Sequence, residues 1–99
     1  MSTLTGKQRQ FLKGLAHPLS PIVRVGKAGV TDAVVAETKK SLDSHELIKV
    51  RIDVEDRGQR RDVVSRLVAD TGAHLVGSVG KVAVLYLARE DEPRIHLPA

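Results

Sequence analysis

Residues 46–55, ELIKVRIDVE, alternate between apolar and charged side chains more regularly than any other part of the chain. Ile48, Val50, Ile52 and Val54 occupy every second position of this stretch. Because successive side chains of a β-strand point to opposite faces, a period of two predicts a strand with one apolar and one charged face. The other elements are predicted around this strand.

A helix is predicted to precede the first glycine-rich turn. The sequence Thr5-Gly6-Lys7-Gln8 has the form of a capping box, in which the first and last residues bond to each other's backbone. Gln8, Phe11, Leu12 and Leu15 then recur at the spacing of one helix face. We therefore expect this face, Phe11 included, to be buried, and we expect the helix to end before Pro18.

The remaining periodicities predict two more helices and three more strands. The second helix runs over about 31–44 with Thr31 as its N-cap, and the third follows the polar connection 56–62 and ends at Gly72. Strands are predicted at 22–25, 75–79 and 82–88, and Gly80-Lys81 suits a type II′ turn between the last two.

These elements predict a single α/β domain. Their order is α-β-α-β-α-β-β, which gives one mixed four-stranded sheet with packed helices, although the strand order stays open. The length of 99 residues fits one domain over 1–99, with a core of about 3–88. The charged tail 89–99, which contains proline, is expected to be loosely held.

Composition narrows the class of protein. The chain has no cysteine, which excludes disulfides and thiolate metal sites. No apolar run is long enough to span a membrane, and the first ten residues lack the apolar stretch of a signal peptide, so we expect a cytoplasmic protein. The four histidines lie far apart, and no nucleophile–base–acid set is visible. We therefore expect no enzyme activity, no metal or other cofactor, and no small-molecule substrate.

Positive charge is concentrated in the N-terminal third. The chain carries 16 Lys and Arg against 12 Asp and Glu, a net charge of +4. The first acidic residue is Asp32, and five basic residues precede it: Lys7, Arg9, Lys13, Arg24 and Lys27. Since affinity for nucleic acids grows with the number of phosphates neutralised, this segregation favours a polyanionic partner over a merely solvated face.

A loop bracketed by glycines lies in the same basic segment. Gly26, Lys27, Ala28 and Gly29 separate a predicted strand from a predicted helix. Glycines let a bulky backbone approach, Lys27 adds charge, and the first amides of the helix lack intrahelical partners. The spacing fits neither a P-loop nor a dinucleotide fingerprint, but G-x-x-G is the pattern with which KH domains clamp nucleic-acid backbones. A tight structural turn stays open as the alternative.

The chain resembles a known family over nearly its whole length. The segments LTGKQRQFLKGLAHPLSPIVRVGKAGVTDAVV, SHELIKVRI, TGAHLVGSVGKVAVLY and RIHLP are similar to bacterial YhbY-type proteins, each a stand-alone CRM domain (chloroplast RNA splicing and ribosome maturation). The resemblance implies a fold similar to the C-terminal domain of translation initiation factor three. It also implies RNA binding through the G-x-x-G loop and association with precursors of the large ribosomal subunit.

The resemblance places the RNA site at Gly26, Lys27, Ala28 and Gly29, and the basic surface around it comprises Lys7, Arg9, Lys13 and Arg24. It gives no support to Arg57, Arg60 and Arg61, whose acidic neighbours indicate local charge balance instead. Ser20 stands where many family members have a lysine.

The expected activity is that of a monomeric binding protein for ribosomal RNA. Phe11 and Tyr86 are the only aromatic residues, so binding is expected to rely on phosphates and RNA shape more than on stacking of bases. Two alternatives remain open. One is a general nucleic-acid-binding architectural protein, and the other is a protein-interaction module with an incidental basic face.

Overall fold

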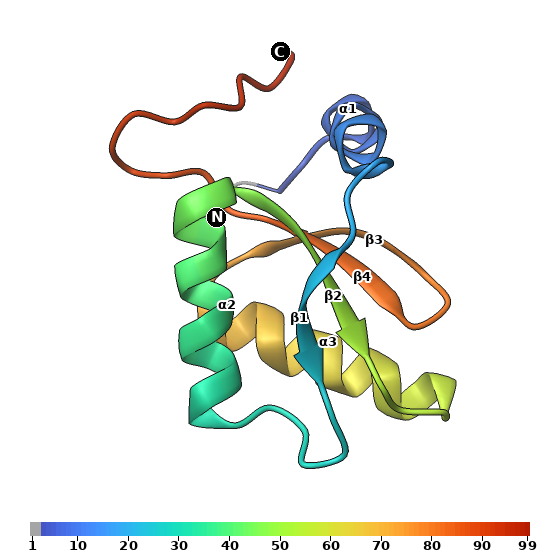
Figure 1. Ribbon diagram of the computed structural model, residues 1–99. Coiled ribbons are helices and arrows are strands. Elements are labelled where there is room, and N and C mark those ends of the chain that lie inside the picture. The colour runs from blue at the N-terminus through green and yellow to red at the C-terminus, as the bar shows by residue number, and fades with distance from the viewer. Residues whose placement is uncertain (1–2) are drawn as a thin grey trace.

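The computed structural model describes residues 3–99, so residues 1 and 2 of the expected domain lie outside the described part. These 97 residues form three helices and four strands in the predicted order (Figure 1). The elements are α1 (Gly6–Ala16), β1 (Pro21–Val25), α2 (Asp32–His45), β2 (Leu47–Ile52), α3 (Arg57–Thr71), β3 (His74–Val79) and β4 (Val82–Tyr86).

The four strands form one mixed sheet in the order β1-β2-β4-β3, a strand order that the sequence left open. β1 is parallel to β2, whereas β4 is antiparallel to both β2 and β3. The β3–β4 connection is the two-residue turn that was predicted. Gly80 has a φ of 57° and Lys81 does not have a positive φ, the combination that a type II′ turn requires.

Helices cover both faces of the sheet and give it two separate cores. α2 and α3 pack on one face, over a large apolar cluster that contains Val25, Val50 and Leu85. α1 packs on the other face, over a smaller cluster that contains Leu12, Val76 and Tyr86. Because side chains alternate along each strand, neighbouring residues of β1 and β2 contribute to opposite faces.

The predicted buried face of α1 is wrong in part: Leu12 is buried as predicted, but Phe11 and Leu15 are not. The capping box between Thr5 and Gln8 is present, but Phe11 and Leu15 are 39% and 42% exposed. Leu12 and Ala16, one helical turn apart, are the buried residues of this helix. A short helix that rests on the sheet along a narrow line buries one row of side chains, so the apolar residues beside that row stay in solvent.

The ends of the other helices agree with the sequence in part. The Thr31 hydroxyl accepts a hydrogen bond from the Val34 N–H at 3.2 Å, and Gly72 ends α3 with a φ of 77°, both as predicted. The predicted connection 56–62 is wrong, because α3 already begins at Arg57. Asp56 is its N-cap and accepts a hydrogen bond from the Gln59 N–H at 2.9 Å, which lets helix form through a polar segment.

Glu46 is a junction residue that the sequence assigned to the start of a strand. It ends α2 with a φ of 63°, and its side chain is 1% exposed. Its carboxylate accepts hydrogen bonds from the backbone N–H groups of Arg89, Arg94 and Ile95 at 2.8–2.9 Å. Burial by itself would raise the pKa of this carboxyl, but these three donors and the charge of Arg89 more than offset it, so the pKa lies below its ordinary value.

The C-terminal tail is therefore held in place, in contrast to the expectation of a loosely held segment. Besides the bonds to Glu46, Ile95 and Leu97 pack against the apolar cluster under α1. The Gln8 side chain also donates to the Pro98 carbonyl at 3.1 Å. The tail thus arches outward above α2 and ends near α1 (Figure 1).

Candidate nucleic-acid interface

The glycine loop is a tight turn at the carboxyl end of β1. The Gly29 N–H donates to the Gly26 carbonyl at 3.1 Å, which closes the turn, while Lys27 and Ala28 are exposed. In Figure 1 this connection projects from the end of the molecule opposite α1. The turn therefore presents its backbone and the Lys27 charge to solvent.

The two glycines of the turn have different structural demands. Gly29 has a φ of 76°, a conformation that side chains with a Cβ rarely adopt. The φ of Gly26 lies outside that region, and a Cβ added there would meet no atom within 4 Å. The fold thus accounts for glycine at position 29 and leaves glycine at position 26 without a structural requirement.

The amino end of α2 lies directly behind the turn. Thr31 is its N-cap, so one of the first amides is already bonded to the threonine hydroxyl. Asp32 lies in the first turn of the helix, where its negative charge partly neutralises the positive end of the helix dipole. Attraction for an anion at this end of the molecule therefore depends more on Lys27 and neighbouring basic residues than on the dipole.

Arg24 lies on β1, two residues before Gly26, and forms an ion pair with an acidic neighbour. Its Nε lies 2.7 Å from Oδ2 of Asp53, and Nε of Arg51 lies 2.7 Å from Oδ1 of the same carboxylate. The hydrogen bond from Arg51 and the charges of both arginines hold the pKa of Asp53 below its ordinary value. Two positive charges face one negative charge here, and 69% of the Arg24 side chain remains exposed.

The basic residues of α1 lie apart from the turn. α1 ends beside the start of β1, whereas the turn follows its end, so the length of a five-residue strand, roughly 15 Å, separates them. Lys7 and Lys13 are exposed, and the end of Lys13 lies against Gly77 of β3. Arg9 is half-buried and donates to the Leu4 carbonyl at 3.3 Å. The predicted site residues therefore form two groups.

Lys49 and Arg51 of β2 occupy the space between these two groups. They alternate with buried core residues, so they lie on the face of the sheet that α1 covers in part. The Lys49 ammonium donates to the carbonyls of His17 and Leu19, at 3.3 and 2.9 Å, and so ties the α1–β1 connection to the sheet. The sequence analysis predicted only that residues 46–55 form a strand with one charged face. The alternation in residues 46–55 was the signal that placed them there.

Within residues 3–99, no group of three or more His, Asp or Glu side chains is arranged to hold a metal ion. None of the helices in that range is both long and apolar enough to cross a bilayer.

The fold and this surface define a class of protein: a small α/β domain that presents a glycine-bracketed basic turn between a parallel strand and a helix. Residues 4–86 match the model of the CRS1 / YhbY (CRM) domain, and the chain belongs to this family.

Relatives of similar length support this assignment. The chain is 45% identical over 98 residues to an RNA-binding protein of Haemophilus influenzae, covering 99% of this chain and 98% of the relative. It is 39% identical over 95 residues to the "Probable RNA-binding protein YqeI" of Bacillus subtilis, covering 96% and 99%. The solution structure of the hypothetical protein SAV1595 from Staphylococcus aureus matches with a TM-score of 0.84 and 31% identity, over 97% of this chain and all of that one.

Proposed function

We propose that this protein binds RNA through the turn Gly26-Lys27-Ala28-Gly29 and the basic residues on either side of it. The family match and the RNA-binding names of its relatives support RNA as the partner. The observation that carries the location is Gly26, a glycine that the fold does not require, next to an exposed lysine. A glycine at such a position is useful where another backbone has to come close.

The binding mode is electrostatic and backbone-directed. Lys27 contacts phosphate, and Arg24 contributes the positive charge that Asp53 leaves unbalanced. Tyr86 is buried, so Phe11 is the one exposed side chain among Phe, Tyr and Trp, and these residues provide no array of exposed rings for stacking. If each of the five N-terminal charges neutralises one phosphate, the log–log salt slope for single strands is about −3 to −4.

The RNA in question is ribosomal RNA during assembly of the large subunit. This assignment rests on the resemblance to YhbY-type proteins and on the match of residues 4–86 to their domain family. Lys7, Arg9 and Lys13 then extend the contact surface to the opposite end of β1, so the RNA has to span both ends of the sheet.

Sedimentation of a cell lysate at low and high salt tests the partner. We expect the protein to travel with large-subunit particles at low salt and to leave them at high salt, because phosphate contacts weaken steeply as salt increases. Recovery of the protein only in the soluble fraction at low salt would contradict the ribosomal assignment. Competition between RNA and DNA duplexes of equal charge then separates an RNA-specific protein from a general nucleic-acid binder.

Substitution of Gly26 by leucine tests the location. A Cβ at position 26 meets no atom within 4 Å, and the residue is exposed, so stability should be retained while RNA binding weakens at least tenfold. Ala36→Leu on α2 is the matched control, because it places the same side chain at an exposed position outside the proposed surface. Unchanged RNA affinity in a folded Gly26→Leu protein would show that RNA does not bind at the turn.

A further inference from the structure

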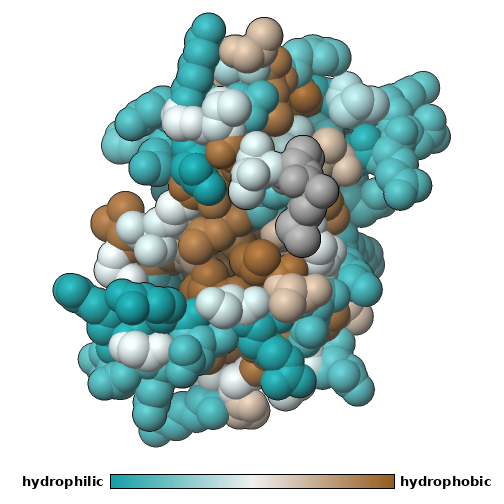
Figure 2. All heavy atoms as spheres, turned by 180° about the vertical axis from the view of Figure 1, so that it is seen from behind, coloured by the Kyte–Doolittle hydropathy of each residue, from teal (hydrophilic) through white to brown (hydrophobic). Residues whose placement is uncertain are grey.

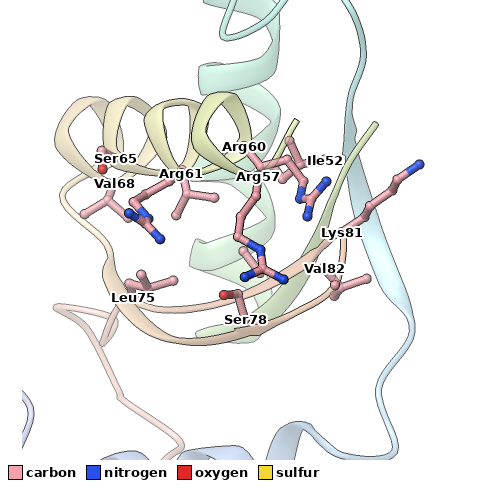
Figure 3. Close-up of a pocket in the computed structure, with 13 residues that line it drawn as sticks. Ile52, Arg57, Arg60, Arg61, Ser65, Val68, Leu75, Ser78, Lys81 and Val82 are labelled. Carbon is pink, nitrogen blue, oxygen red and sulfur yellow. The ribbon is translucent and has the colours of Figure 1, made fainter. Parts of the chain in front are cut away.

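A groove of about 510 Å³ lies between α3 and the β3–β4 hairpin, on the face of the sheet opposite α1. Figure 3 shows α3 along one side and the hairpin along the other, with the side chains of Arg57 and Arg61 reaching from the helix into the space between them. Its apolar wall includes Ile52, Val64 and Ala83, all buried residues of the main core. A cavity of this size accommodates a single small-molecule group.

The groove is lined by arginines whose charge the neighbouring residues do not neutralise. Among residues 3–99, neither Arg57 nor Arg61 has a carboxylate oxygen within 4.0 Å. The nearby Glu55 is paired with Lys81, whose hydrogen bond and charge lower its pKa. The local charge balance predicted from the sequence is therefore wrong for Arg57 and Arg61.

Arg60 has a different role from its two neighbours. Its Nη1 donates to the carbonyls of Val54 and Glu55, at 2.8 and 2.6 Å, and so fastens the start of α3 to the end of β2. In Figure 3 its side chain lies near Ile52, away from the centre of the groove. Arg57 and Arg61 are thus the residues available to a ligand.

The groove and the glycine turn open at the same end of the sheet. The Asp53 N–H donates to the Val25 carbonyl, next to Gly26, and the Ile52 N–H donates to the Lys81 carbonyl, at the tip of the hairpin. The turn and the hairpin tip therefore flank the end of β2 on its two sides. Two inter-strand spacings, roughly 10 Å, separate them, which is a short step for a nucleic-acid strand.

Apolar surface is accessible on the rear face of the molecule. Hydrophobic residues gather there in a hollowed band across the middle of the molecule, between polar surfaces above and below (Figure 2). β3 lies at the edge of the sheet, and its Leu75, which lines the groove, is 38% exposed.

We propose that this groove holds one unpaired nucleotide of the bound RNA, with its base over the apolar wall and its flanking phosphates on Arg57 and Arg61. The proposal rests on the proposed function and adds a second contact to it. Two arginines without a carboxylate partner favour an anionic ligand. The apolar wall of the groove favours a flat apolar group. A nucleotide supplies both, and the guanidinium group of arginine matches the geometry of a phosphate.

Amide NMR of the labelled full-length protein tests the proposal, with a ten-residue oligouridine as the probe. We expect shifts at Lys27 and Ala28 in the turn and also at Ser78 and Lys81 beside the groove. Shifts confined to the turn would overturn the nucleotide groove and leave the proposed function intact. Absence of any binding at low salt would overturn both.

Two variants separate the phosphate contact from the base contact. Arg57→Gln with Arg61→Gln should weaken oligouridine binding about tenfold and make the salt slope shallower by about 0.7 to 1.4, for one or two phosphates lost. Ser78→Phe, which fills the groove from an exposed strand position, should weaken binding at least threefold with the salt slope unchanged. The matched control is Lys39→Gln with Lys40→Gln, which removes the same charge from the exposed side of α2.

Two results would overturn the assignment of a nucleotide. One is an Arg57/Arg61 double variant whose affinity and salt slope equal those of the Lys39/Lys40 control. The other is a deca-glutamate peptide that shifts Ser78 and Lys81 as strongly as the oligouridine does, since the groove would then recognise an acidic chain instead of a base.

Discussion

The carboxylates at the two ends of β2 have different surroundings and different roles. At its start, the Glu46 carboxylate is enclosed and accepts three backbone N–H groups, which fastens the C-terminal tail to the end of α2. At its end, Asp53 is shared between two arginines that stay accessible, and the turn beyond leaves Lys27 in solvent. An enclosed charge with all its bonds made stabilises the chain, whereas an exposed and partly balanced charge remains available to a partner.

Loss of the Glu46 carboxylate should have the largest effect on stability. Glu46→Ala leaves the amides of Arg89, Arg94 and Ile95 without their acceptor, and lost bonds to a charged group cost about 2–3 kcal/mol of unfolding free energy. Urea denaturation measures this change. The RNA affinity of the folded protein should stay at the wild-type value, because Glu46 is buried and its carboxylate cannot contact RNA. A Glu46→Ala protein that keeps its stability but loses RNA affinity would show that Glu46 serves binding and not stability.

The pH dependence of stability should follow the same residue. Because the pKa of Glu46 is lower in the folded protein, its contribution is complete above the ordinary value of 4.5 and is lost as the pH falls through the folded pKa. Urea denaturation from about pH 6 to about pH 3 should therefore show a steeper decline for wild type than for Glu46→Gln. Asp53 and Glu55, whose pKa values are also lowered, keep a residual decline in the variant. Parallel curves for the two proteins would contradict the assignment.

The two glycines of the turn should separate stability from binding. Gly29→Ala forces a Cβ into a left-handed conformation and should lower the unfolding free energy by about 1 kcal/mol. Gly26→Ala should change it by less than about 0.5 kcal/mol, as is usual for an unstrained surface position. Thermal denaturation beside RNA titration distinguishes the pair. Equal destabilisation by both substitutions would show that the fold needs both glycines.

Neutralisation of Asp53 should have the smallest effect. Asp53→Asn releases Arg24 and Arg51 from their shared carboxylate, and exposed ion pairs of this kind contribute about 0–1 kcal/mol. We expect RNA binding at low salt to strengthen two- to threefold, because the local net charge becomes more positive. Filter binding over a salt series measures it, and the gain should vanish as salt increases. A weaker interaction would mean that Asp53 positions Arg24 for its contact.

Sequence analysis succeeded where local patterns carry the signal. The alternation in residues 46–55 identified β2, Thr31 and Gly72 identified helix ends, and Gly80 identified the hairpin turn, and the structure confirms each of them. These features depend on neighbouring residues in the chain, such as a side chain that bonds to an amide three positions away. The family resemblance is confirmed as well.

Sequence analysis failed where the outcome depends on distant segments. Phe11 and Leu15 fit the apolar stripe of α1, but the width of the contact with the sheet decides which row is buried. Glu46 fits the start of a strand, but three amides of the tail, more than forty residues away, make it a buried junction. The sequence contains no local signal for either.

The candidate site shows the same division. The order of the chain alone determined that a basic, glycine-bracketed turn joins a strand to a helix, because turn chemistry and charge are local properties. The strand order β1-β2-β4-β3 decided what lies beside that turn. It brought the hairpin tip and the arginines of α3 to the same end of the sheet, and it placed α1 at the other end of β1. The strand order is set by hydrogen bonds between strands that are distant in sequence, so only the tertiary structure reveals it.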